Sequence, residues 1–283
     1  MPYSNTKKRV TLISLSLVLL LFSCAEESEL ERTKSLANDG DAMAQLRLGE
    51  MHNFGEGIPH DYEEAVKWYR MSADQGNAMA QYHLYAMYDD GTGVSKDPKE
   101  AIKWIRMSAN QGYDVAQLRL GVLYEFGSGI PHDYLEAAKW YRKSAEQGQS
   151  KAQCNLGFMY ENGRGVPLDY REAISWYRMS ADQGDASAQY YLGAMYGKGE
   201  GVPKDYKEAV KWYRMSADQG YAMAQFVLGM MYYNGLGVPK DYKQAYVWIY
   251  NAKMNYHESA TGKLDIITEE MTKEQIADAT SLA

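Results

Sequence analysis

The sequence contains little of several features that define common protein classes. Two cysteines in 283 residues exclude a fold held together by many disulfide bonds. The 37 acidic residues outnumber the 30 basic ones, so the chain lacks the positive field that binding to nucleic-acid phosphates requires. Its longest apolar run, residues 10–22, is shorter than the roughly 20 residues that span a membrane as a helix. With 46% apolar residues, the chain is nevertheless too hydrophobic to be disordered.

The N-terminus has the pattern of an export signal. Basic residues 7–9 precede the apolar run, which is typical of a signal peptide. The sequence Leu-Phe-Ser-Cys that ends at Cys24 resembles the lipobox of bacterial lipoproteins. That resemblance implies removal of residues 1–23, acylation of Cys24 and, because Ala25 is not Asp, a periplasm-facing place on the outer membrane. The alternative is ordinary secretory cleavage near Ser23, which leaves Cys24 as a plain thiol.

The rest of the chain repeats with a period of 36 residues. Six alanines mark the period: Ala44, Ala80, Ala116, Ala152, Ala188 and Ala224. All six tryptophans obey it as well: Trp68, Trp104, Trp140, Trp176, Trp212 and Trp248. Nearly every glycine falls on one of four repeat positions, and the exceptions are Gly197 and Gly262. A period of this size is typical of a solenoid, in which stacked units bury one continuous core.

Each unit has the pattern of a helical hairpin. Ala44, Leu48 and Met51 recur at the three- and four-residue spacing of an amphipathic helix, which Gly55 terminates. Asp61 is the expected N-cap of a second helix. The predicted inward stripe of that helix consists of Tyr62, Ala65, Trp68, Tyr69, Ser72 and Ala73.

The two ends of the array are predicted to be capped. Residues 24–40 contain a linker and a half-repeat, with a helix over Leu30–Asn38. Six hairpins follow over residues 41–252. Residues 253–283 are expected to supply one capping helix over Thr268–Leu282, with Met271, Ile276 and Ala279 or Leu282 facing inward.

The repeating unit resembles the Sel1-like repeat, a relative of the tetratricopeptide repeat. The fifth unit follows that motif closely through Ala188-Gln189, Leu192-Gly193, Met195-Tyr196, Gly199-Glu200-Gly201-Val202-Pro203 and Asp205-Tyr206. The resemblance implies an all-α fold, namely a right-handed α/α solenoid with a concave groove. It also implies an adaptor that binds a partner protein or peptide, and it implies neither an enzyme nor a cofactor.

The sequence offers little for catalysis or metal binding. The Ser-x-x-Lys pattern of β-lactamases occurs only at Ser4–Lys7, inside the segment expected to be removed. His60 and His132 lie two repeats apart, too far to share a metal ion. Cys154 replaces larger apolar residues at its repeat position and is expected to be a small core filler. The alternatives kept open are a β-lactamase-like hydrolase of the cell envelope and a binder of peptidoglycan or other sugars.

Positions that differ among the six units are free of packing duty and are candidates for binding. On the first helix, the offsets represented by Arg47, Glu50 and Phe54 share one face. We call the face they form along the array the first-helix strip, and we predict that it binds the partner. Its candidate residues are Arg47, Glu50, Phe54, His83, Asp90, Arg119, Phe126, Asn155, Phe158, Asn162, Tyr191 and Lys198. The strip becomes more apolar at Val227 and Met230.

The second helices, in contrast, carry an arginine at the same position in five of the repeats. These arginines are Arg70, Arg106, Arg142, Arg178 and Arg214. These are expected to be structural and to pair with acidic neighbours or helix ends.

Overall fold

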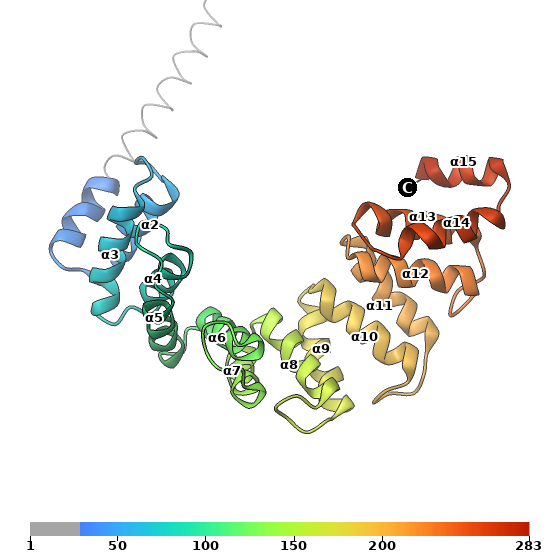
Figure 1. Ribbon diagram of the computed structural model, residues 1–283, viewed down its shortest axis with the longest axis horizontal. Coiled ribbons are helices and arrows are strands. Elements are labelled where there is room, and N and C mark those ends of the chain that lie inside the picture. The colour runs from blue at the N-terminus through green and yellow to red at the C-terminus, as the bar shows by residue number, and fades with distance from the viewer. Residues whose placement is uncertain (1–28, 283) are drawn as a thin grey trace, which may run out of the picture. The chain divides into compact units, whose positions relative to one another are not determined.

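The computed structural model describes residues 29–282, which form α-helices joined by short loops and no strand (Figure 1). Consecutive helices pack in pairs, which confirms the predicted α/α solenoid. The chain divides into two compact units, one ending at Leu120 and one beginning at Gly121. The predicted signal peptide and Cys24 lie outside the described residues.

The helices have nearly uniform lengths because each ends at a repeated cap. In the first unit, residues 29–38 are helical. They are followed by α2 (Ala42–Phe54), α3 (Tyr62–Asp74), α4 (Ala78–Asp90), α5 (Pro98–Asn110) and α6 (Asp114–Phe126), within which the division falls. The second unit continues with α7 (Tyr134–Glu146), α8 (Ser150–Asn162), α9 (Tyr170–Asp182), α10 (Ala186–Lys198), α11 (Tyr206–Asp218), α12 (Ala222–Asn234), α13 (Tyr242–Met254), α14 (Ala260–Glu269) and α15 (Lys273–Leu282).

The caps are those that the sequence predicts. Asp61 accepts a hydrogen bond from the backbone N–H of Glu64, and the aspartates that begin the later second helices do the same in their own repeats. The first helix α2 ends at Gly55 in the left-handed conformation, with φ of 72°.

Five of the six hairpins close around one aromatic ring, and the sixth packs Ile249 against Gly229 instead. A Cβ atom at Gly49 of α2 would lie 2.7 Å from the ring of Tyr69 of α3, so glycine lets the two helices approach. The second repeat exchanges these residues. Tyr85 of α4 stands at the glycine position and Ile105 of α5 at the tyrosine position, and both are buried. The ring therefore comes from the first helix in this repeat and from the second helix in its neighbours.

Successive repeats are joined by a ladder of paired glutamine amides, in which one glutamine of each pair is buried. Gln81 Nε2 donates to the carbonyl of Ala73 at 3.1 Å, and Gln111 Nε2 in turn donates to Gln81 Oε1 at 2.6 Å. The same pairs of bonds recur in the second unit. Each amide satisfies a carbonyl near the end of a second helix, where the helix itself offers no donor.

The ladder shows that residues 29–38 occupy the place of a second helix. Gln45 Nε2 donates to the carbonyl of Ala37 at 3.0 Å, as Gln81 does to Ala73. Ala37 itself is completely buried beside Leu48. The N-terminal half-repeat is therefore present as predicted.

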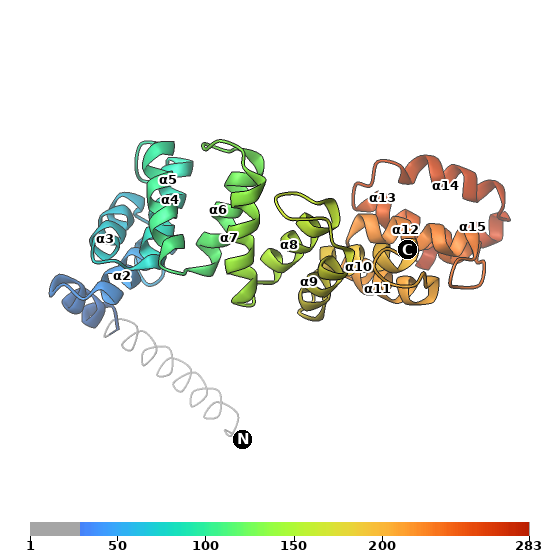
Figure 2. The same cartoon turned by 90° about the horizontal axis from the view of Figure 1, so that it is seen from below.

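The C-terminal end differs from the single helix expected over Thr268–Leu282. Two helices, α14 and α15, pack on α13 instead (Figures 1 and 2). They separate at Thr272, whose hydroxyl accepts from the N–H of Gln275 while Gln275 Oε1 accepts from the N–H of Thr272. This reciprocal capping box begins a new helix at Lys273.

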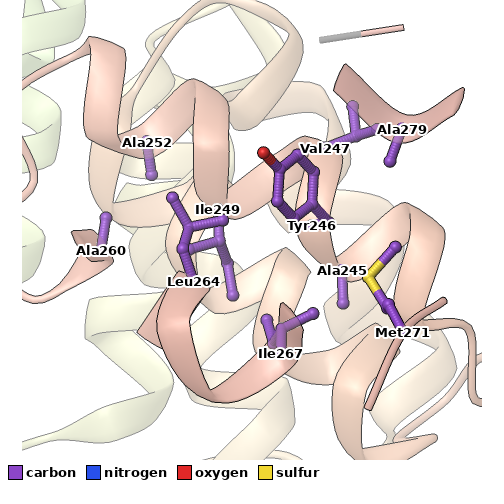
Figure 3. Close-up of a cluster of buried hydrophobic side chains, with 10 residues drawn as sticks. All are labelled: Ala245, Tyr246, Val247, Ile249, Ala252, Ala260, Leu264, Ile267, Met271 and Ala279. Carbon is purple, nitrogen blue, oxygen red and sulfur yellow. The ribbon is translucent and has the colours of Figure 1, made fainter. Parts of the chain in front are cut away.

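Both terminal helices bury apolar side chains against α13. Figure 3 shows Leu264 of α14 beside Ile249, and Ala279 of α15 beside Val247. Met271 and Ala279 are buried as expected, whereas Leu282 is 61% exposed. Of the two alternatives for the last inward residue, Ala279 is the one found.

Four of the repeated arginines of the second helices, Arg70, Arg142, Arg178 and Arg214, bond to tyrosine hydroxyls rather than to the acidic neighbours or helix ends expected. Arg142 and Arg178 donate to the hydroxyls of Tyr160 and Tyr196, at 2.5 and 2.6 Å, in the next repeat. Arg70 and Arg214 donate to Tyr88 and Tyr232 in the same way. Their planar guanidinium groups also lie near aromatic rings, and together these contacts join one hairpin to the next.

Candidate partner-binding surface

The first-helix strip falls into two parts because the chain divides after Leu120. The first unit contributes Arg47, Glu50, Phe54, His83, Asp90 and Arg119, and the second contributes Phe126, Asn155, Phe158, Asn162, Tyr191 and Lys198. None of these side chains is fully buried. In each unit some strip residues contact one another, as the next paragraphs describe.

In the first unit, Glu50 is the centre of a cluster from two repeats. Its carboxylate lies 3.7 Å from Arg47 Nη1 and 3.8 Å from His83 Nε2. Arg47 is shared with Glu56 at 2.7 Å, and the imidazole of His83 stacks on Tyr69 with centroids 4.6 Å apart. Burial raises the pKa of Glu50 and lowers that of His83, since it penalises the charged form of each.

Arg119 is held against the next repeat toward the N-terminus. Its Nη2 lies 3.5 Å from Asp89 Oδ2, and its Nε donates to the hydroxyl of Tyr85. Desolvation raises the pKa of Tyr85 to about 12, so the hydroxyl stays protonated and bonds to Asp89 at 3.3 Å. Arg119 is therefore part of the packing as well as of the strip.

In the second unit, Glu161 takes the central place. Its Oε2 accepts from the buried hydroxyl of Tyr177 at 2.6 Å, and its Oε1 lies 3.6 Å from Lys198 Nζ. Lys198 is shared with Glu200 at 3.2 Å. The ring of Tyr191 stacks on Tyr177 with centroids 5.1 Å apart, in the arrangement that His83 and Tyr69 have in the first unit.

Other strip residues differ in how far they are available to a partner. Phe54 and Phe126 are 54% and 70% exposed, although both are apolar. Phe158 is covered in part by Tyr191 and by the guanidinium of Arg164, 5.2 Å from its ring centroid. Asn162 donates back to the carbonyl of Phe158, Asn155 is half-buried, and Asp90 is exposed. Phe54, Phe126 and Asp90 are therefore accessible parts of the strip.

The sequence analysis missed one set of carboxylates. The repeat position of Asn53 carries Asp89, Glu125 and Glu161 in the next three repeats, and each acid bonds to a tyrosine hydroxyl, as Tyr141 does to Glu125 at 2.5 Å. An acid near the C-terminal end of a helix is unfavourable with respect to the helix dipole. Because the same unfavourable position carries an acid in three repeats, the sequence could have indicated that each acid has a specific hydrogen-bond partner.

Among the groups considered for chemistry, Cys154 lies in the core, whereas His60 lies on the surface. Cys154 is 6% exposed, and burial raises the pKa of its thiol, so the reactive thiolate is disfavoured. His60 is exposed and its Nδ1 lies 3.0 Å from the carbonyl of Asn53. Within residues 29–282, no three His, Cys, Asp or Glu side chains are grouped to hold a metal ion. In the same range, no helix has the length and apolar character to cross a membrane.

The repeats match a known family model from end to end. Six consecutive matches to the Sel1 repeat cover residues 42–77, 78–113, 114–149, 150–185, 186–221 and 222–256. The chain belongs to the Sel1 repeat family. Proteins of the Sel1 repeat family are generally scaffolds for protein interactions and typically are not enzymes.

Two solved structures support this assignment. A Sel1 repeat protein from Oxalobacter formigenes is 37% identical over 80% of this chain and 99% of that one, with a TM-score of 0.69. The protein c5321, described as a protective antigen of uropathogenic Escherichia coli with an SLR fold, is 35% identical over 89% of this chain, with a TM-score of 0.60. The alignment covers 62% of c5321. Among curated proteins, none matches this chain.

Proposed function

We propose that this Sel1 repeat protein is a non-catalytic scaffold that binds an extended, basic segment of a partner protein along the first-helix strip. The observation that carries the proposal is that each unit exposes a phenylalanine ring of the strip, Phe54 at 54% in the first unit and Phe126 at 70% in the second. Aromatic side chains bury a large area at little cost in conformational entropy, and they are enriched among the residues that dominate binding energies.

The charges of the strip favour a basic partner. Arg47 is shared between Glu50 and Glu56, and Lys198 is shared between Glu161 and Glu200, so each cation faces two carboxylates. Each cluster therefore carries a surplus negative charge. A lysine or arginine of a partner would complement that surplus and would speed the encounter.

The proposed location of the scaffold is the cell envelope, with the membrane contacted only through lipid on Cys24. The basic, apolar and Leu-Phe-Ser-Cys segments of residues 7–24 support this proposal. Two acyl chains anchor a protein stably where one does not. Growth with labelled palmitate should label the wild type and leave Cys24→Ala unlabelled. Equal labelling of both would contradict the proposed site of acylation.

The partner is tested with a photo-crosslinking amino acid placed at position 126 in the native host. The matched control places it at position 179, because Met179 is also exposed, at 47%, but lies on the second helix α9. Specific protein crosslinks from position 126 alone are expected. Arg119 is left unchanged, because it bonds to Tyr85 and Asp89 and its loss would disturb the packing.

Two results would contradict the proposal. Equal crosslinks from positions 126 and 179 would show that the strip is the wrong surface. Crosslinks to sugar polymer and to no protein would favour the alternative of peptidoglycan binding.

A further inference from the structure

The fifth repeat has a glycine at a position where the first four repeats have a polar side chain. The position that carries Asn53, Asp89, Glu125 and Glu161 in the first four repeats carries Gly197 in the fifth. Gly197 is the next-to-last residue of α10, and it lies on the edge of the first-helix strip beside Lys198. The missing side chain opens a hollow of about 230 Å³ between α10, α11 and α12, all of which belong to the second unit.

The local packing does not require this glycine. Gly197 is not among the residues with positive φ, and a Cβ atom there would have its nearest neighbours at 3.8 Å and 4.0 Å, which are ordinary contacts. Glycine inside a helix is less stable than alanine. The glycine is thus the less stable choice at a position whose neighbours would accept a side chain, and its effect is to keep the hollow open.

The hollow is lined mainly by apolar side chains. Ala194 of α10 and Val227, Met230 and Met231 of α12 form much of its wall, with the ring of Tyr213 of α11 below. Methionine side chains are flexible and adapt to differently shaped apolar groups. In the two preceding repeats a glutamate faces the equivalent tyrosine hydroxyl, and at Tyr213 the glycine removes that group.

Lys198, the charged residue that lines the hollow, is flanked by two carboxylates that do not line it, so the charged groups next to the hollow have a net negative charge. Its Nζ lies 3.6 Å from Glu161 and 3.2 Å from Glu200. The two carboxylates outnumber the single ammonium group. On the other side, Asn234 is neutral and its amide donates to the carbonyl of Met230 at 2.8 Å. A basic group of a ligand is therefore favoured at the rim, and an acidic one is disfavoured.

We propose that this hollow is the anchor subsite for one large apolar side chain of the partner segment, with a lysine or arginine next to it in sequence. The proposal rests on the proposed binding of a partner along the strip. The size of the hollow fits one side chain, since sites for whole small molecules are about 300–1,000 Å³. The surplus carboxylate charge beside it selects the basic neighbour.

The experiment measures binding of three fluorescein-labelled decapeptides to the full-length chain by anisotropy. The first has a central leucine flanked by lysines, the second replaces the leucine by alanine, and the third replaces the lysines by glutamates. The first is expected to bind about tenfold or more tightly than the second, since a buried apolar anchor contributes on that order, and more tightly than the third, whose glutamates are repelled by the carboxylates beside Lys198. Spectra of methyl-labelled methionine should show shifts at Met230 and Met231 with the first peptide.

Two variants at one position separate filling of the hollow from other effects. Gly197→Gln places a side chain of the same shape as Glu125 and Glu161 into the hollow without adding charge, and it should weaken the first peptide about tenfold. Gly197→Ala adds only a methyl group and should leave binding within about threefold. Thermal melting of both variants confirms folding.

Equal binding of the three peptides, or unaltered binding to Gly197→Gln, would overturn the subsite, as would methionine shifts that leave Met230 and Met231 unaffected. Crosslinking from position 126 tests the scaffold proposal independently of the peptide experiment. If it captures a partner while the peptides fail, the scaffold stands and the subsite falls. If the leucine peptide binds as expected but position 126 captures nothing, the hollow binds peptide as described, but the proposed partner-binding strip around position 126 falls.

Discussion

The same substitution at two helical glycines of the second unit should change stability in opposite directions. Gly157 lies inside α8 and Gly197 inside α10, and neither has a positive φ. Alanine is more favourable than glycine in a helix by about 0.8–1.0 kcal/mol. Backbone conformation alone therefore predicts that Gly157→Ala and Gly197→Ala both stabilise the protein.

At Gly157 this gain is opposed by a steric clash. The new Cβ atom would lie 2.8 Å from Cδ1 of Tyr177 and 3.2 Å from the carbonyl oxygen of Ala173. The Tyr177 ring has little freedom to retreat, because its hydroxyl is bonded to Glu161 and its face is stacked on Tyr191. Overpacking of this kind costs about 1–3 kcal/mol. After the gain in helix propensity, a net loss of up to about 2 kcal/mol remains.

At Gly197 the gain is unopposed. The nearest atoms to a Cβ there are Cβ of Ala209 and Oη of Tyr213, at 3.8 Å and 4.0 Å. We expect Gly197→Ala to raise the free energy of unfolding by about 0.5–1 kcal/mol. The two variants should thus differ by about 2 kcal/mol, which for a chain of this size is a difference in Tm of about 4–8 °C.

Thermal melts followed by circular dichroism, supported by urea titration, measure the difference directly. Wild type should melt between the two variants. If Gly157→Ala melts at or above wild type, the Tyr177 ring is free to move and the account of hairpin closure by a glycine and a ring is refuted. If Gly197→Ala melts below wild type, the hollow at that position is not open space.

Three further predictions address the ends, the clusters and the ladder. Deleting residues 270–283 should expose the apolar face of α13 around Val247 and produce larger species in size-exclusion chromatography, whereas an unchanged elution profile and Tm would contradict the capping role of α15. Burial lowers the pKa of His83 in the folded state, so the unfolded chain takes up the proton first and wild type should lose stability as pH falls below about 6.5. In paired thermal melts, His83→Tyr should lose less stability than wild type between pH 7.5 and 5. Equal losses of stability in the two proteins would exclude this role of His83. Gln153→Met leaves the carbonyl of Ala145 without its donor and should cost about 1–3 kcal/mol in urea unfolding, and a cost near zero would show that water replaces the amide.

The repeated part of the fold could be predicted because six copies report the same constraints. A residue that returns every 36 positions, such as Asp61 or Gly55, has the same local role in each repeat. The structure confirms that Asp61 is an N-cap and Gly55 a C-cap. The partners of the repeated arginines could not be predicted in the same way. The hydroxyl that accepts from Arg142 belongs to Tyr160, 18 residues away, and periodicity gives no direction to a side chain.

The C-terminal region shows the opposite limit. Once the period is lost, only local signals remain, and the apolar spacing of Met271, Ile276 and Ala279 predicts one helix across Thr272, where the structure has a capping box with Gln275. The candidate strip was predicted as a face. Its clusters depend on acids, such as Glu161, that lie between that face and the core.

The exchange of ring and small residue in the second repeat limits how this chain can be rearranged at the level of its gene. Recombination at a boundary between two hairpins keeps Tyr85 with Ile105 and Gly49 with Tyr69. Loss or duplication of a whole repeat therefore leaves these pairs within each hairpin intact. A crossover inside a hairpin that joins α4 to a second helix from the third repeat would bring Tyr85 and Tyr141 into a space built for one ring. The pairing of ring and small residue is therefore preserved only when each hairpin is inherited whole.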